Sequence, residues 1–191
     1  LLWLRSAMAQ WLPAPGETHR IWKLLTMHHP PRTPRGCACR VFGKCIGGHG
    51  DEHALDQQLQ QALEGLEPPD MVFAGHNHCY GRSHPLDLKG NPVKEGQGGV
   101  RYFVTGGGGA PLYGIEGGDP RLAKAESIYH FVYMRLTASA AFYWTIDANG
   151  RVRDSGCFEK GSNVDLPLAP DFRYDDALPP RCAVDASQPA V

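Results

Sequence analysis

The chain has 191 residues, of which 42% are hydrophobic and 20% are charged, and this length predicts one domain of ordinary size with a sizeable core. The chain has 19 Lys and Arg residues and 20 Asp and Glu residues, so its charge balance gives no signal for binding nucleic acid or an anionic membrane. No apolar run approaches the roughly 20 residues that cross a bilayer, and no signal segment is recognisable after Leu1. The composition argues against a membrane protein and a disordered chain, and favours a soluble globular one.

The first half of the chain predicts a β-α-β unit. Apolar residues recur at helical spacing between Leu1 and Leu12, and a short apolar run at 21–27 then predicts a buried strand. Residues 32–50 carry Gly, Pro and three Cys without periodicity, which is typical of a long loop at a binding site. A second helix is expected from Asp51, as N-cap, to Leu66, and residues 71–74 follow as a strand. A strand, a helix and a strand in this order indicate a parallel sheet.

The second half of the chain predicts antiparallel strands. Residues 100–105 and 128–136 are rich in aromatic and β-branched residues, as strands usually are. Residues 142–146 and 151–158 flank Asp-Ala-Asn-Gly, a turn signal that predicts a hairpin. From Gly161 onward repeated prolines interrupt every pattern, so we expect one domain over residues 1–160 and an extended, Pro-rich tail over 161–191.

Histidines follow both strands of the predicted β-α-β unit. His28 and His29 come directly after the first strand, and His76 and His78 come directly after the second. Because the carboxyl ends of parallel strands meet at one edge of a sheet, these imidazoles are expected to share a crevice. Neutral imidazole is a common ligand of Zn, Fe and Mn, so the pattern favours a metal site, although a His-x-His pair also occurs by chance in surface loops.

Several short motifs, taken in order, resemble the calcineurin-like metallophosphoesterases, and in particular their purple-acid-phosphatase-like branch. The match extends over about residues 1 to 160. The motifs are His28-His29-Pro30-Pro31, then Gly48-His49-Gly50, then Gly75-His76-Asn77-His78-Cys79-Tyr80-Gly81-Arg82, and finally Val104-Thr105-Gly106-Gly107-Gly108-Gly109-Ala110-Pro111. The branch carries Gly-His-x-His-x-Tyr-Glu-Arg, so Gly81 departs from it where a Glu is expected.

The resemblance implies an α/β (α+β) fold, half of a β-sandwich flanked by helices, that hydrolyses phosphoesters at a binuclear metal centre. It implies that His28 and His76 bind one ion and His78 the other, with two divalent or mixed-valence ions among Zn, Fe and Mn as cofactors. His49 would lie near the substrate phosphate and assist the leaving group. Arg82 is a candidate for substrate binding, with a structural ion pair as the alternative, and the glycine run is expected to form a tight loop under the metal site.

The family's first three motifs, Asp-x-His, Gly-Asp-x-x-Asp and Gly-Asn-His, belong upstream of the opening helix, and none of them is present there. They supply the bridging carboxylate and further ligands, so the resemblance implies that these residues form the carboxyl-terminal half of the domain. The expected partners are therefore a phosphoester substrate and an upstream half, and the isolated chain is expected to be inactive. The alternative is a phosphoesterase-like module that binds a partner or ligand and has lost catalysis.

Six cysteines favour an oxidising compartment, and hence a secreted or periplasmic protein. Cys37 with Cys45 and Cys157 with Cys182 are the pairings we expect, with Cys79 as a buried free thiol. An alternative to the Cys37–Cys45 disulfide is a zinc knuckle formed by Cys37, Cys39, Cys45 and His49, although the usual Cys-x-x-Cys spacing is lacking.

Overall fold

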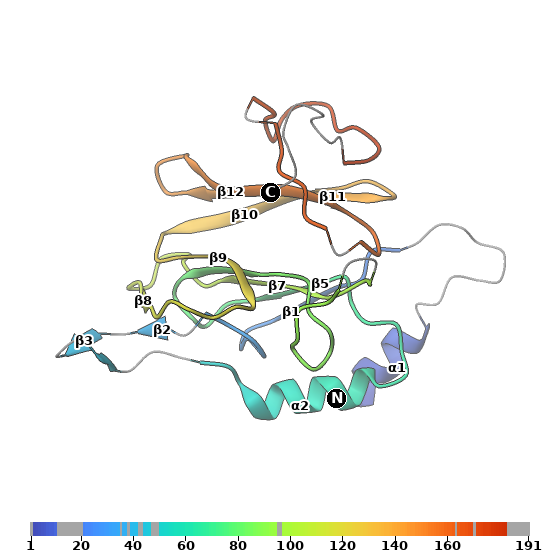
Figure 1. The fold of residues 1–191 in the computed structure, drawn as a ribbon, viewed down its shortest axis with the longest axis horizontal. Helices are drawn as coiled ribbons and strands as arrows, with labels where there is room; N and C mark the ends of the chain where they lie inside the picture. The colour runs from blue at the N-terminus through green and yellow to red at the C-terminus, as the bar shows by residue number, and fades with distance from the viewer. Residues whose placement is uncertain are drawn as a thin grey trace.

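The computed structural model describes residues 2–10, 21–34, 36–37, 39–41, 44–46, 50–94, 97–162, 164–169 and 171–182. Within these residues, two sheets stack face to face and two helices cover the outer face of the first sheet (Figure 1). This arrangement confirms the predicted half-sandwich flanked by helices, with parallel strands first and antiparallel strands after.

The first sheet combines the predicted β-α-β unit with strands from the middle of the chain. Its order among the described residues is β1-β5-β7-β6-β9. The first three strands are parallel, whereas β6 and β9 are antiparallel to their neighbours. The bounds are β1 Leu24–Met27, β5 Met71–Ala74, β6 Tyr80–Ser83, β7 Arg101–Thr105 and β9 Leu122–Glu126. The three strands predicted at 21–27, 71–74 and 100–105 are confirmed as β1, β5 and β7, although β1 is only partly buried and not buried as predicted. Strands β6 and β9 are additions.

Both predicted helices are present and pack together against the sheet. The helices are α1 Leu2–Gln10 and α2 His53–Leu63, and their buried face comprises Leu4, Met8, Leu59, Ala62 and Leu63. This face repeats at three- and four-residue intervals, as an amphipathic helix requires.

The prediction that Asp51 caps the second helix is wrong. The N-cap is Glu52, whose side chain makes no capping hydrogen bond. The Asp51 carboxylate instead accepts hydrogen bonds from the Thr33 backbone N–H at 2.9 Å and from the Arg121 guanidinium at 2.6 Å. It therefore joins two loops rather than starting a helix.

The second sheet is the predicted antiparallel hairpin with one more strand beside it. Its order is β10-β11-β12, with bounds β10 His130–Leu136, β11 Ala140–Asp147 and β12 Val152–Glu159. Tyr143 and Phe158 from this sheet pack against Met71, Tyr80 and Phe103 from the first sheet. This layer between the sheets forms the central core, and its burial is the main favourable term in holding them together.

The segment from 164 to 182 covers the outer face of the second sheet without forming a helix or a strand in the described residues. Leu166, Leu168, Phe172 and Leu178 pack against the outward side chains of β11. Cys157 of β12 is joined to Cys182 by a disulfide bond, with the two Cα atoms 5.7 Å apart, which confirms that predicted pair. Cys79 is a buried free thiol, also as predicted.

Four short strands complete the described structure. β2 Gly36–Cys37 pairs with β8 Gly114–Ile115, and β3 Cys39–Val41 pairs with β4 Lys44–Ile46. The side chains of Cys37, Cys39 and Cys45 lie outside the described residues, so their disulfide and zinc-knuckle predictions stay predictions. Among the described helices, none has the length and apolarity to span a bilayer.

Candidate metal centre

Three of the candidate histidines lie together where strands β1 and β5 end. The strands run parallel, with Met27 beside Ala74, so the residues that follow them emerge at the same edge of the sheet. A hydrogen bond from the Gly75 backbone N–H to the His28 carbonyl, at 3.0 Å, extends this pairing past the strands. The topology thus places His28 and His76 next to each other, as predicted from the sequence.

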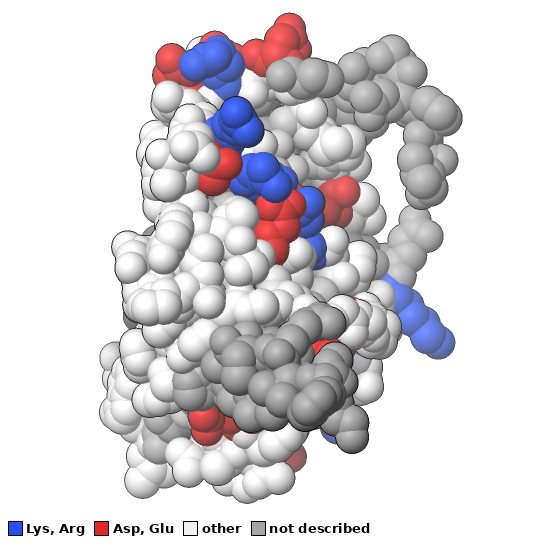
Figure 2. Space-filling view, turned by 90° about the vertical axis from the view of Figure 1, so that its left-hand side faces the viewer, with Lys and Arg blue, Asp and Glu red and all other residues white. Residues whose placement is uncertain are grey.

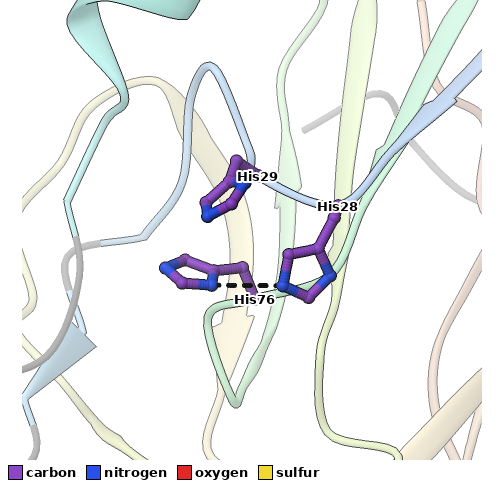
Figure 3. Close-up of side chains that lie close together, drawn as sticks. All are labelled: His28, His29 and His76. Atoms are coloured by element: carbon purple, nitrogen blue, oxygen red, sulfur yellow. Dashed lines mark hydrogen bonds between the residues drawn. The ribbon is translucent and has the colours of Figure 1, made fainter.

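His28, His29 and His76 form a compact group of imidazoles (Figure 3). One ring nitrogen of each lies within 4.8 Å of the others, and His28 Nε2 lies 3.3 Å from His76 Nδ1. The two nitrogens are at hydrogen-bonding distance in the structure, and two nitrogens bound to one tetrahedral Zn²⁺ at about 2.0–2.1 Å also stand roughly 3.3 Å apart, so the same spacing suits two ligands of one ion. His28 and His29 are exposed and His76 is half-buried, which leaves the group open to an ion from solvent.

The backbone of the loop after β5 holds His76 in an unusual conformation. Its φ is 60°, in the left-handed region, where residues with a Cβ are uncommon. Such backbone strain costs of order 1 kcal/mol and is concentrated at functional sites. The conformation is part of a tight turn in which the Asn77 N–H donates to the Gly75 carbonyl and the Cys79 N–H donates to the Asn77 carbonyl.

Asn77 anchors this loop to the segment that follows the other two histidines. Its side chain is completely buried, and its amide nitrogen donates to Thr33 Oγ1 at 2.8 Å and to the Pro34 carbonyl at 2.6 Å. These bonds connect the His76 loop to the loop that begins at His28. The three imidazoles are therefore positioned by a shared, buried hydrogen-bonding residue.

The glycine run after β7 packs beneath the same loop, which confirms its predicted role as a tight supporting loop. A Cβ on Gly106 would clash with the carbonyl group of Asn77, and one on Gly107 would clash with the Ile128 carbonyl and the His130 ring. Only glycine permits these close approaches of one backbone to another. A Cβ on Gly108, by contrast, would meet no atom within 4 Å.

His78 lies on the same loop but outside the group of three. Its Nδ1 is 2.9 Å from the Pro111 carbonyl, and its ring stacks on Tyr113 with centroids 4.5 Å apart. Because a carbonyl can only accept, Nδ1 must donate, and the lone pair is then on Nε2. A carbonyl bound to the second ring nitrogen is the usual partner of a metal-ligating histidine, since it fixes the tautomer and the ring orientation.

Cys79, between the loop and β6, is not suited to act as a ligand. Burial raises the pKa of its thiol to about 12, so the neutral form prevails. The thiolate, which is the form that binds metal, is disfavoured there.

Arg82 forms structural ion pairs, which was one of the two roles that the sequence allowed for it. Its guanidinium is nearly buried and contacts Asp154 at 2.7 Å and Asp165 at 2.8 Å, while Arg101 binds the other oxygen of Asp165 at 2.6 Å. Burial by itself would lower the pKa of the Arg82 guanidinium, but hydrogen bonding to Asp154 and the negative charges of Asp154 and Asp165 together outweigh it and raise that pKa. The network ties the first sheet to the second sheet and to the segment after it, and the geometry favours this role over substrate binding.

The absence of a Glu at position 81 has a local structural reason. A Cβ at Gly81 would overlap the ring of Pro34, which fills the space instead. The loop that follows His28 and His29 therefore packs directly on β6, and no carboxylate side chain fits there.

His49 lies outside the described residues, so its assignment to substrate and leaving group stays a prediction. His53 is the first residue of α2 and is exposed, as expected for a solvated residue. His29 is the one member of the group to which no ligand role was predicted. Its place next to His28, directly after a predicted strand, was the signal in the sequence.

The chain is similar to known proteins in fold but not in sequence. No family model and no curated protein matches it in sequence. Among solved structures it is similar to a purple acid phosphatase isolated from seeds of yellow lupin (Lupinus luteus), with a TM-score of 0.59 and 18% sequence identity. The chain has the fold of part of a purple acid phosphatase. The similarity covers 82% of this chain and 27% of that chain, so this chain spans about a quarter of its length. The predicted resemblance is thereby confirmed for the fold.

Proposed function

We propose that this chain takes part in metal-dependent hydrolysis of phosphoesters and supplies one portion of a binuclear centre. The observation that carries the proposal is the group of three imidazoles within 4.8 Å at the carboxyl edge of a parallel sheet. The shared fold with a purple acid phosphatase supports the same reaction class.

The ligand set in this proposal is built from the chain's own histidines. His28 and His76 hold one ion through nitrogens that already have ligand spacing, and the exposed ring of His29 can rotate to complete a set of three. His78 contributes Nε2 to the second ion, with the Pro111 carbonyl fixing its orientation. The ions, when bound, polarise the phosphoryl oxygens and lower the pKa of water. His49 gives a proton to the leaving alcohol.

The remaining ligands come from outside the described residues in this proposal. The group found among those residues consists of three neutral donors and contains no carboxylate. Two cations 3.5–4 Å apart repel strongly, and they are held together by a bridging anion. The described donors thus suit one cation, and we propose that an upstream half supplies the acidic ligands of the pair.

A metal titration of the 191-residue chain tests the imidazole site. Zn²⁺ binding measured by calorimetry, with Co²⁺ absorption as a second readout, should give one ion per chain. His28→Ala should weaken binding by more than about tenfold because it removes a direct ligand. His76→Asn should do the same while keeping a residue that tolerates the left-handed backbone. The matched control is His53→Ala, an exposed histidine on α2, which should bind as the unmodified chain does.

The phosphatase step is tested separately with an aryl phosphate. The chain alone should turn over little of it with added metal, and a protein that joins the chain to a domain half containing the acidic motifs should hydrolyse it. In that protein His76→Asn and His78→Ala should each lower metal content and rate together. Rapid hydrolysis by the chain alone would refute the divided centre. If none of the histidine variants changed metal binding, the alternative of a metal-free binding module would replace this proposal.

A further inference from the structure

A second candidate site lies on the outer side of strand β10, the free edge strand of the second sheet among the described residues. A cavity of about 850 Å³ opens there between the glycine loop, the turn that joins β11 to β12, and the segment around Tyr174. This volume is within the range of pockets that bind small molecules. The cavity is separate from the three imidazoles, and none of them lines it.

Aromatic side chains form most of the cavity wall. Tyr129, Phe131 and Tyr133 alternate along the chain and face outward, because the intervening Val132 packs into the central core. Tyr174 stands opposite, with its ring 5.9 Å from that of Tyr133 and inclined to it by 76°. These four residues are between 39% and 55% exposed to solvent, so a ligand can reach their rings.

The charged groups that line the cavity are both carboxylates. Asp147 is the last residue of β11 and Asp175 follows Tyr174, whereas no Lys or Arg belongs to the described lining. Backbone N–H groups of the turn, from Arg151 first and Asn149 after it, hold the pKa of Asp147 below its usual range. Asp147 is therefore ionised at neutral pH, and the lining carries negative charge.

The buried imidazole of His130 lies on the core side of β10, behind this lining and against Tyr80, so its shielded Nε2 is out of reach of a ligand in the cavity. His130 is 7% exposed, and its Nδ1 lies 3.0 Å from the Ile128 carbonyl, to which it must donate. The lone pair is then on Nε2, for which the described residues offer no hydrogen-bond donor. A polar atom buried without a partner is costly and is found in few places per structure.

Two arginines lie behind the wall and position it. The Arg135 guanidinium donates to the carbonyls of Tyr174 and Asp176, and the Arg173 guanidinium approaches Asp175 at 3.4 Å. Their contacts are made from outside the cavity lining. Arg135 and Arg173 hold the Tyr174 segment over β10. The negative charge of the site is reduced by Arg173 and by Arg153, whose Nη1 lies 3.9 Å from Asp147 Oδ2.

We propose that this cavity binds an organic cation, an ammonium group carried on an apolar or aromatic body. The faces of Tyr and Phe rings attract cations, and carboxylates accept hydrogen bonds from an ammonium group. The apolar part of the ligand is covered by the remaining ring surface. An anionic ligand is disfavoured by both carboxylates.

A matched pair of probes tests the proposal on the 191-residue chain. Phenethylamine, which is protonated at pH 7, and 2-phenylethanol, its neutral counterpart of equal size, are titrated while ¹H–¹⁵N NMR signals are followed. Phenethylamine should shift the signals of Gly107, Gly108 and Phe131, and should bind at least about threefold more tightly than the alcohol. Tyr133→Leu should weaken phenethylamine binding by about two- to fivefold, the effect of one ring at a partly exposed site.

Two further variants test the contribution of charge and provide a control far from the cavity. Asp175→Asn should reduce the preference for phenethylamine over 2-phenylethanol, and Trp3→Leu, at an exposed ring on α1, should change neither ligand's affinity. Equal affinity for the two probes, or shifts confined to other parts of the molecule, would overturn the proposal. The titration contains neither metal nor phosphoester, so its outcome is independent of the proposed phosphatase function.

Discussion

Replacing Gly106 by alanine should lower both the stability of the fold and its affinity for metal. The Cα of Gly106 lies directly against the backbone of Asn77, in the loop that carries His76, and leaves no room for a Cβ. An added Cβ would lie 2.8 Å from the Asn77 carbonyl carbon and closer still to its oxygen. Ordinary carbon contacts are at 3.5–4.0 Å, so the Asn77 peptide or the glycine loop must move by roughly 1 Å. Overpacking of this kind costs about 1–3 kcal/mol, and a chain of this size loses about 2–4 °C of Tm per kcal/mol.

The same displacement also moves His76, which directly precedes Asn77 in the chain. Misplacing one of two nitrogens that are now 3.3 Å apart should weaken Zn²⁺ binding, and we expect a loss of about tenfold or more in calorimetric titration. Gly108→Ala is the matched control, since a Cβ there meets nothing within 4 Å and should leave both the Tm and Zn²⁺ affinity unchanged. If Gly106→Ala melted and bound Zn²⁺ as Gly108→Ala does, the described packing of the glycine loop would be wrong.

Three other predictions concern the cysteines and one acidic loop residue. The Cys157–Cys182 bond spans 25 residues, and the chain-entropy model gives a stabilisation of about 3.5 kcal/mol, so Cys157→Ala should lower the free energy of unfolding by about that amount in urea. In the unmodified folded chain Cys79 is buried, so thiol reagents should modify it only after unfolding; fast labelling of that thiol at pH 7 would contradict its burial. Hydrogen bonding to Arg121 lowers the pKa of Asp119, so its carboxylate stabilises the fold above its unfolded pKa of about 3.9 and this contribution is lost as the pH falls through the lower folded value. Asp119→Asn should therefore destabilise the protein at pH 7 and have progressively less effect below about pH 4, and an effect that grew on acidification would be inconsistent with this ion pair.

The elements predicted from the sequence are those whose burial follows a local period. The apolar faces of α1 and α2 and the runs that became β1, β5 and β7 are visible without any long-range information. The Asp-Ala-Asn-Gly turn fixed the hairpin of β11 and β12 in the same way. Parallel pairing then followed from chain order, and it brought His28 and His76 to one edge of the sheet as expected.

Strands β6 and β9 were not predicted because their burial depends on distant partners. The sequence Tyr-Gly-Arg-Ser of β6 has no strand period, yet it is buried because Arg82 meets Asp154 and Asp165, 72 and 83 residues further along the chain. Pro34 fills the space beside Gly81 in the same strand. No window of local sequence contains these pairs.

The candidate site was predicted in its location and only partly in its membership. His29 joins the group through the direction of an exposed ring, which depends on the loop and not on residue spacing. The support beneath the site, from Asn77 and Gly106, is made of backbone contacts that residue types do not reveal. The roles of His28, His76, His78 and His49 remain predictions for the experiments described above.

The covering of the second sheet by residues 164–182 determines where the chain can be shortened. All eight residues of β11 are buried, since its two sides meet the central core and this irregular segment. Cutting the chain at the predicted boundary after residue 160 would therefore expose Phe142 and Trp144 to water and leave Cys157 without its partner. A strand with two apolar sides and no cover is a site for aggregation. Residues 164–169 and 171–182 thus serve as an outer wall of the sandwich, and a minimal folding unit has to extend at least to Cys182.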